Sequence, residues 1–243
     1  MTAVPELTHP AVAAETVPIN DLRHHCSPAW LRLARHEQQL LHVPDVPVAA
    51  TLWISADADW SAQRAASPLL TRLYPNGHRL HGDVTCTGSA LPFENDSLQT
   101  IVVQHAADLM PSVSTLLDEL CRVLEPGGQL FWFGLNPLST WAAWSHWHSG
   151  SRPLHPRWLQ GIDRMLARHG VDAIDSRYLG GLWPQSKAVN EARRYSLLDG
   201  LRGAWLLSAR KRRAVLTPLR PVIRVRKPRH QPLSALPSSR THP

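Results

Sequence analysis

One stretch, residues 91–141, constrains the fold of this chain more than any other. Within it, the run at 99–103, rich in β-branched residues, is typical of a strand that is buried on both faces. A second apolar run at 130–133 predicts another strand, which Gly134 and the Asn136-Pro137 pair end. Parallel strands need a crossover connection, so the segment between the two runs decides how they pair.

A helix is predicted between these two strands. Its apolar residues recur at the i, i+3, i+4, i+7 spacing of one helix face, and they are Val113, Leu116, Leu117, Leu120 and Leu124. Ser112 can cap its start, and Pro126-Gly127-Gly128 can stop it, because proline cannot continue a helix and glycine accepts the turn. A strand, a helix and a strand within about 30 residues form a βαβ unit, which makes the two strands parallel and adjacent.

The same spacing and turn signals predict the remaining elements. They are helices at 28–41, 61–73, 141–147, 156–169 and 190–201, strands at 49–55, 78–84, 171–178 and 204–211, and a turn at 74–77. Only about 30 residues separate Trp60 from Leu91, whereas two full strand–helix units need roughly twice that length. We therefore expect an α/β sheet with helices on both faces, trimmed by one strand–helix unit.

The long stretch resembles a known family. Leu91-Pro92-Phe93 is followed by Asp96-Ser97, and residues 119–128 read ELCRVLEPGG. This combination of an LPF loop, a strand and a helix of the form E-x-x-R-V-L-x-P-G-G is similar to class I S-adenosylmethionine-dependent methyltransferases of type 11. The continuation at 134–141, GLNPLSTW, is similar to a small bacterial branch of that family.

The resemblance implies a Rossmann-like class I methyltransferase sheet in a domain of residues 49–211. In that family the last strand, here 204–211, inserts antiparallel beside the strand at 171–178. Residues 1–48 then form an N-terminal extension, whose helix packs beside the sheet or covers the pocket. Residues 212–243 form a basic, proline-rich tail, and its composition predicts disorder.

The resemblance also implies a site for S-adenosylmethionine. The floor of that site would be Ser55, Ala56, Asp57 and Asp59, the adenosine side would be Asp83, Thr87, Ala90 and Leu91, and Gln104 would follow the central strand. In the family the floor is a glycine-rich turn, and an Asp stands at each of the positions of Thr87 and Gln99. This chain departs from the pattern at all three places.

Candidate catalytic and substrate residues follow the predicted strands. Ligands of open α/β sheets bind beyond the carboxyl ends of the strands, so His105 is a candidate general base, or else a histidine satisfied at a strand end. Asn136, Trp141 and Trp144 are candidate substrate residues; the two indoles share one helix face with Trp147 and form either a packing face or an aromatic wall. No metal site is predicted, because His146, His148 and His155 lack metal-ligand spacing and acidic or Cys neighbours.

Composition limits the class of protein. The chain has no apolar run of 18 residues, which argues against a membrane span, and its three distant cysteines favour a reducing compartment, so we expect a cytoplasmic protein. The charge is uneven: residues 211–243 contain nine Lys or Arg and no acid, while residues 1–210 hold 17 Lys and Arg against 19 Asp and Glu. The tail could bind nucleic acid or an acidic partner, or act only as a solubilising segment.

Two function hypotheses from different classes remain. The first is a methyltransferase that moves the methyl group of S-adenosylmethionine to a small-molecule or nucleic-acid acceptor. The alternative is a non-catalytic relative that kept the sheet, lost the cofactor and acts as a binding or scaffold protein. A third hypothesis makes the basic tail the working part. The sequence leaves the acceptor and the oligomeric state open.

Overall fold

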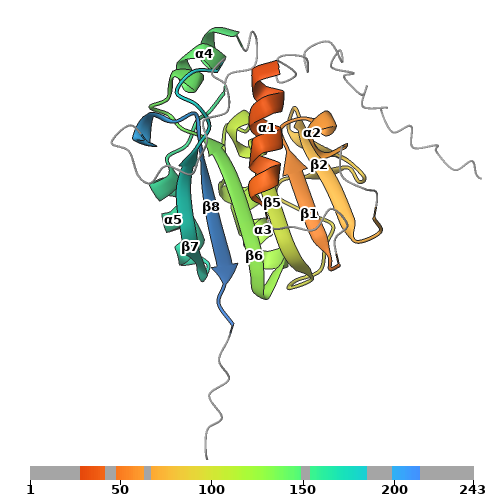
Figure 1. Ribbon diagram of the computed structural model, residues 1–243. Helices are drawn as coiled ribbons and strands as arrows, with labels where there is room; N and C mark the ends of the chain where they lie inside the picture. Colours follow the sequence, from red (N-terminus) through yellow and green to blue (C-terminus); the bar gives the residue numbers. More distant parts are fainter. Residues whose placement is uncertain (1–27, 42–47, 63–66, 149–153, 185–198, 214–243) are drawn as a thin grey trace, which may run out of the picture. The chain divides into compact units, whose positions relative to one another are not determined.

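The computed structural model describes residues 28–41, 48–62, 67–148, 154–184 and 199–213 (Figure 1). The described helices are α1 (Pro28–Leu40), α2 (Ala58–Ala62), α3 (Ser114–Val123), α4 (Thr140–His148) and α5 (Leu159–Arg168), with 3-10 turns η2 (Ala106–Leu109) and η3 (Asp199–Leu201). The described strands are β1 (Thr51–Ser55), β2 (Leu70–Asn76), β3 (Arg79–Gly82), β4 (Cys86–Thr87), β5 (Leu98–Gln104), β6 (Leu124–Leu135), β7 (Val171–Leu179) and β8 (Ala204–Lys211).

These strands form one mixed sheet in the order β4-β3-β2-β1-β5-β6-β8-β7. The four central strands β2, β1, β5 and β6 run parallel, and their carboxyl ends point to the top of Figure 1. β8 lies antiparallel between β6 and β7. The predicted βαβ unit and the predicted antiparallel insertion of the last strand are both confirmed.

The sheet is also trimmed by one strand–helix unit, as expected, and the missing unit lies between β2 and β3. β2 and β3 are joined by a tight antiparallel hairpin in which Asn76 pairs with Arg79, so no helix crosses over between them. The predicted helix at 61–73 is wrong over its second half, because residues from Leu70 onward form β2. Leu70 and Leu73 suit a helical spacing, but pairing with β1 buries both side chains in the sheet instead.

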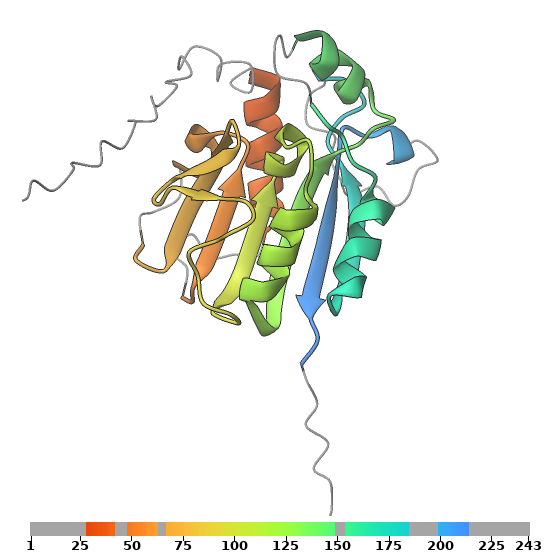
Figure 2. The same cartoon turned by 180° about the vertical axis from the view of Figure 1, so that it is seen from behind.

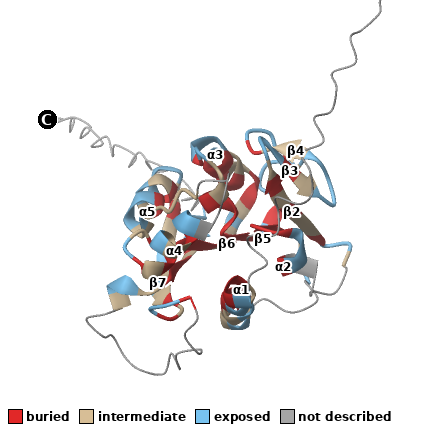
Figure 3. Ribbon diagram, turned by 90° about the horizontal axis from the view of Figure 1, so that it is seen from above, coloured by how far each residue is buried: buried red, intermediate tan, exposed pale blue. Residues whose placement is uncertain are grey.

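Helices cover both faces of the sheet (Figure 3). On one face α3 and α5 lie side by side (Figure 2) and bury one set of apolar side chains with Leu52, Ile101 and Trp132. On the other face α1 and α2 cover a second set that includes Trp53, Val102 and Phe133. Successive strand residues point to opposite faces, which is why Leu52 and Trp53 belong to different cores.

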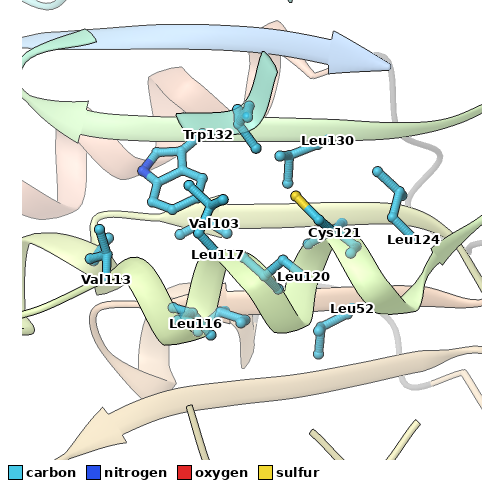
Figure 4. Close-up of a cluster of buried hydrophobic side chains, with 14 of the residues drawn as sticks. Leu52, Val103, Val113, Leu116, Leu117, Leu120, Cys121, Leu124, Leu130 and Trp132 are labelled. Carbon is cyan, nitrogen blue, oxygen red and sulfur yellow. The ribbon is translucent and has the colours of Figure 1, made fainter. Parts of the chain in front are cut away.

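Helix α3 follows the predicted apolar pattern. Leu116, Leu117 and Leu120 are at most 1% exposed and point onto the strands beneath them (Figure 4). The predicted cap does not form: Val113 occupies the N-cap position without a side-chain hydrogen bond. The chain leaves the helix at Leu124, two residues before the predicted proline stop, and enters β6 directly.

Helix α1 confirms the prediction at 28–41, and its inward face holds an unexpected residue. Trp30, Leu33, Ala34 and Glu37 follow the spacing of one helix face, and all four are buried. A buried carboxylate needs partners. Most of the predicted helix at 190–201 and nearly all of the predicted tail lie outside the described residues. None of the described helices has the length and apolar character needed to span a membrane.

Candidate functional site

A buried ion-pair network lies where β5 ends. His105 follows β5 directly and has a left-handed backbone φ of 54°. Its Nδ1 lies 2.9 Å from Asp108 Oδ2, and its Nε2 lies 2.8 Å from Glu37 Oε1 on α1. These three residues are at most 2% exposed. The network therefore joins α1 to the carboxyl end of β5 inside the protein.

These contacts determine the charge of His105. Burial by itself lowers the pKa of the imidazole, but the carboxylates of Glu37 and Asp108 outweigh burial and raise the pKa of His105 to about 10. Both ring nitrogens then carry a proton and donate it to a carboxylate. As it lies, His105 has no nitrogen free to take a proton from a substrate, so its predicted role as a general base needs a different arrangement of α1.

Further hydrogen bonds satisfy the two carboxylates. Asp108 Oδ2 also accepts the Leu135 backbone N–H at 2.8 Å, and Glu37 Oε2 accepts Gln104 Nε2 at 2.9 Å. Gln104 Nε2 donates in addition to the Ala34 carbonyl on α1 at 3.1 Å. Because buried charges are costly unless they are paired and hydrogen-bonded, this network fixes α1 on the sheet.

Two indole rings cover His105. Trp30 on α1 and Trp60 on α2 place their ring centroids 5.2 and 6.0 Å from that of the imidazole, in edge-on orientations. The two indoles also contact each other at 5.8 Å, and they are 3% and 1% exposed. The two indoles therefore pack over His105 at the end of β5.

The predicted cofactor floor follows β1 at the same edge. Ser55, Ala56 and Asp57 are 0%, 1% and 6% exposed. Ser55 Oγ donates to the Asp57 carbonyl at 2.6 Å, and the Ala56 N–H donates to the Gln104 carbonyl at 2.8 Å. The turn into α2 has only two residues, and exposed Asp59 donates its backbone N–H to Asp57 Oδ1. The structure thus brings the predicted floor residues and Gln104 together.

The predicted adenosine residues lie elsewhere. Asp83 follows β3, which runs antiparallel, so it lies beside Arg72 and level with the middle of β1. Its Oδ2 accepts the Arg72 backbone N–H at 2.7 Å and closes the hairpin. Thr87 pairs with Arg79 and does lie at the carboxyl edge, but on β4, three strands from β1 and about 14 Å away at the usual strand spacing.

Ala90 and Leu91 belong to a loop clamped by α3. The Ala90 N–H donates to the Thr87 carbonyl, and the buried Leu91 donates its N–H to Glu119 Oε2 at 2.9 Å. Arg122 then donates to the Leu91 and Phe93 carbonyls at 3.1 and 3.0 Å, while it pairs with Glu119 at 2.7 Å. The clamp explains why an LPF loop and an E-x-x-R helix occur together in one sequence.

Among the predicted substrate residues, Asn136 has a structural position. It is 2% exposed, and its Nδ2 donates to the Gly200 and Arg202 carbonyls at 2.8 and 2.9 Å. Its Oδ1 accepts the Leu138 N–H. The side chain therefore holds the loop after β6 against the segment that precedes β8.

Trp141 and Trp144 lie on α4, with ring centroids 6.4 Å apart. Trp141 is 4% exposed, contacts Trp30 edge-on at 5.6 Å, and donates its indole N–H to the Gly181 carbonyl at 2.9 Å. It lines a cavity of about 200 Å³ between α1 and residues 180–184. Trp144 is half-buried beside it, and neither Trp144 nor Asn136 lines that cavity.

Four residues of the buried network and its cover were not predicted as site residues from the sequence: Glu37, Asp108, Trp30 and Trp60. A signal for Glu37 was present, because a carboxylate on the apolar face of an amphipathic helix requires a buried partner. Asp108 stands three residues after His105, within reach across a single turn. In the described part of the chain, no group of His, Cys, Asp and Glu is arranged to hold a metal ion.

Sequence comparison finds methyltransferases. Residues 63–132 match the family model of a methyltransferase domain. Phthiotriol/phenolphthiotriol dimycocerosates methyltransferase 1 of Mycobacterium ulcerans is 31% identical over 102 residues, which is 38% of either chain. The corresponding methyltransferase of Mycobacterium leprae is 32% identical over 88 residues, 35% of this chain and 33% of the relative. The chain thus matches 38% and 33% of the length of these two relatives.

Solved structures give the same fold. A chain from the Haloferax volcanii complex between the Trm112 methyltransferase activator and a methyltransferase superposes with a TM-score of 0.51 at 12% identity, covering 79% of this chain and 92% of that one. An S-adenosylmethionine-dependent methyltransferase of Thermotoga maritima gives 0.50 at 10% identity over 75% and 91%. The fold is that of the class I methyltransferases. Within it, residues 63–132 are similar in sequence to a methyltransferase domain.

The fold implies S-adenosylmethionine, and the residues at the carboxyl edge test whether it fits. In open α/β sheets ligands lie in the crevice where the strand order reverses, here between β1 and β5. Ser55 and His105 form a backbone bridge at that point, with the Ala56 N–H donating to the Gln104 carbonyl. With Trp30 and Trp60 above them, the residues as they lie do not fit the cofactor.

Proposed function

We propose that this protein is a binding protein built on the class I methyltransferase fold, in which its own side chains take the place of the cofactor. The observation that carries the proposal is the closed end of the β1–β5 crevice. There the Glu37–His105–Asp108 network and two indoles occupy the position where a ligand of this fold would lie. In this arrangement no methyl donor reaches the strand ends.

The proposal is tested by titrating the purified protein with S-adenosylmethionine and with S-adenosylhomocysteine in a calorimeter. We expect no saturable heat, and no rise in melting temperature at millimolar ligand. A ligand present at 100 times its Kd would stabilise the folded state by about 2.7 kcal/mol, so binding would be easily seen. Saturable micromolar binding of either compound would overturn the proposal.

If S-adenosylmethionine or S-adenosylhomocysteine binds, two variants show where on the protein it binds. Asp57→Asn changes a carboxylate at the end of β1, whereas Asp83→Asn changes one level with the middle of that strand. A cofactor bound at the carboxyl edge would be weakened by the first change and not by the second. Equal effects would place the bound compound elsewhere on the protein.

The second candidate function is methyl transfer to a small-molecule acceptor, and the matched segment at 63–132 favours it. Methyl transfer would require α1 to leave the carboxyl ends of β1 and β5, which would free His105 from Glu37. His105→Ala should then lower turnover and leave cofactor affinity nearly intact. The two Mycobacterium relatives are methyltransferases named for phthiotriol and phenolphthiotriol dimycocerosates. Hydroxylated lipids are therefore the first acceptors to assay.

A nucleic-acid partner is a separate proposal that rests on the basic composition of residues 212–243. Binding through Lys and Arg to phosphates weakens as salt rises. Deleting 212–243 should abolish retention on single- and double-stranded nucleic acid at moderate salt. Unchanged retention by the shortened protein would remove the tail from consideration.

A further inference from the structure

We propose that the cavity between α1 and residues 180–184 binds a small organic anion with an apolar body, a carboxylate or a phosphate ester. This inference names a ligand class for the proposed binding function and rests on it. The cavity is separate from the closed β1–β5 crevice, and its volume is about 200 Å³, enough for a compound of the size of benzoate and too small for a nucleotide cofactor.

Two arginines give one wall of the cavity a positive charge. Arg32 and Arg35 line it from α1, together with His36, on the flank of the helix that does not face the sheet. Both arginines are exposed, and within the described residues neither forms an ion pair. Among the described residues that line the cavity there is no Asp or Glu. Guanidinium groups bind carboxylate and phosphate through paired hydrogen bonds, so this wall selects an anion.

Trp141 gives the lining an aromatic part that its contacts hold in place. The indole of Trp141 is held by its hydrogen bond to the Gly181 carbonyl, and its ring packs directly on Gly203, where an added Cβ would lie 2.7 Å from Cδ1. A ring fixed in this way loses little conformational entropy when a ligand packs on it. The apolar body of the ligand would therefore contact Trp141, while its charged group would reach the arginines.

The floor is main chain that only glycine permits. Gly180 has a φ of +74°, and a Cβ there would lie 3.0 Å from Leu33 Cδ1 on α1. Arg202 donates to the Gly180 carbonyl at 3.4 Å and pairs with Asp199 at 2.7 Å, which holds this turn in place. The Trp141 ring and the turn at Gly180 are thus each held by contacts within the protein, without a ligand.

The first experiment measures binding of benzoate, phenyl phosphate and neutral benzamide by tryptophan fluorescence and calorimetry. We expect the anions to bind in a saturable way, at least tenfold more tightly than benzamide, and more weakly at high salt. The order of benzoate and phenyl phosphate distinguishes a carboxylate ligand from a phosphate ester. Equal binding of benzoate and benzamide, or no saturable binding of any probe at about 10 mM, would overturn the proposal.

The second experiment locates the site. Arg32→Gln with Arg35→Gln should weaken benzoate binding by roughly tenfold or more, since each charged hydrogen bond contributes about 1.5–3 kcal/mol. Arg164→Gln, which changes an exposed arginine of α5 on the other face of the sheet, should leave binding unchanged. All changed side chains are exposed, so the variants should fold, which circular dichroism checks. Benzoate affinity equal in all three proteins would contradict the assignment.

The two proposals fail separately. If S-adenosylmethionine binds and Asp57→Asn weakens that binding, the proposal that the β1–β5 crevice is closed is overturned. The proposal for the anion cavity is then unaffected. A signal from S-adenosylmethionine that Arg32→Gln removes and Asp57→Asn preserves would come from its carboxylate in the cavity. Loss of benzoate binding alone would leave the proposed replacement of the cofactor standing.

Discussion

His105 Nε2 lies 2.8 Å from Glu37 Oε1, and this contact joins the end of a central strand to a helix 68 residues earlier in the chain. Because both groups are buried and charged, each supplies the counter-charge that makes burial of the other tolerable. The pair decides where α1 sits, and the position of α1 decides whether the carboxyl end of the sheet is open or closed.

Removing the Glu37 charge should destabilise the protein strongly. Glu37→Gln leaves the imidazolium with one buried counter-charge, and breaking a buried pair costs roughly 3–5 kcal/mol. Urea unfolding followed by circular dichroism measures the change. The matched control is Glu94→Gln, which changes an exposed carboxylate and should stay within about 0.5 kcal/mol of the parent protein. Similar values for both variants would mean that the network contributes no stability.

Stability should fall at alkaline pH because of His105. Folding raises the pKa of this imidazole from 6.5 to about 10, so its contribution is fully present below pH 6.5 and is lost as the pH rises through about 10. The side chain of the His105→Gln variant does not titrate in this pH range. The difference in unfolding free energy between parent and variant should therefore shrink from pH 6.5 to pH 10, and a constant difference would rule out the charged form.

Gly203→Ala should disturb the cavity through Trp141. The new Cβ would meet the indole at 2.7 Å, so the ring must shift and strain its hydrogen bond to Gly181. We expect a loss of about 1–3 kcal/mol together with weaker benzoate binding. Gly200→Ala is the control, because an added Cβ meets nothing within 4 Å there. Equal changes in stability and in benzoate affinity for the two variants would argue against a fixed Trp141 ring.

Two buried tryptophans should respond differently to loss of the indole N–H. Trp141 donates to the Gly181 carbonyl, whereas no described residue accepts a hydrogen bond from the N–H of Trp60. Both changes to phenylalanine leave a cavity of similar size, but Trp141→Phe also loses a buried hydrogen bond. It should cost about 1 kcal/mol more than Trp60→Phe, measured by urea unfolding of both variants in parallel.

Arg122→Lys should loosen the LPF loop. The guanidinium reaches the Leu91 and Phe93 carbonyls and Glu119 at the same time, and a single ammonium cannot reproduce that fork. Hydrogen exchange should speed up at the amides of Leu91 and Phe93, with α5 unaffected. Arg164→Lys, an exposed change, provides the comparison. Unaltered exchange in the loop would show that the clamp is dispensable.

Much of the fold could be predicted from local patterns. The apolar spacing of α3 and the apolar runs on either side of it predicted the parallel pair β5 and β6, and the apolar residues at 28–41 predicted the helix α1, because such patterns reflect which side meets the core. The failure at 70–73 has a physical reason: Leu70 and Leu73 suit either a helix or a strand, and only the partner strand β1 decided between them.

The candidate site was less predictable. Sequence order placed Ser55 to Asp57 and Gln104 to His105 after two strands, and parallel pairing of β1 and β5 brought them together as expected. Asp83 lies level with the middle of β1, away from the carboxyl ends, because β3 reverses direction, which residue types alone do not reveal. The partners of His105 come from α1 and from the turn after β5, and their approach depends on how a helix docks.

The sequence by itself determined the class of fold, the parallel pairing of β5 with β6 and the departures from a glycine-rich cofactor loop, since these follow from periodicity and from residue types at given positions. Only the tertiary structure decided that the carboxyl end of the β1–β5 crevice is closed and that a cationic cavity lies beside it. The physical reason is that both depend on the docking of α1, where long-range ion pairing and side-chain packing outweigh every local preference.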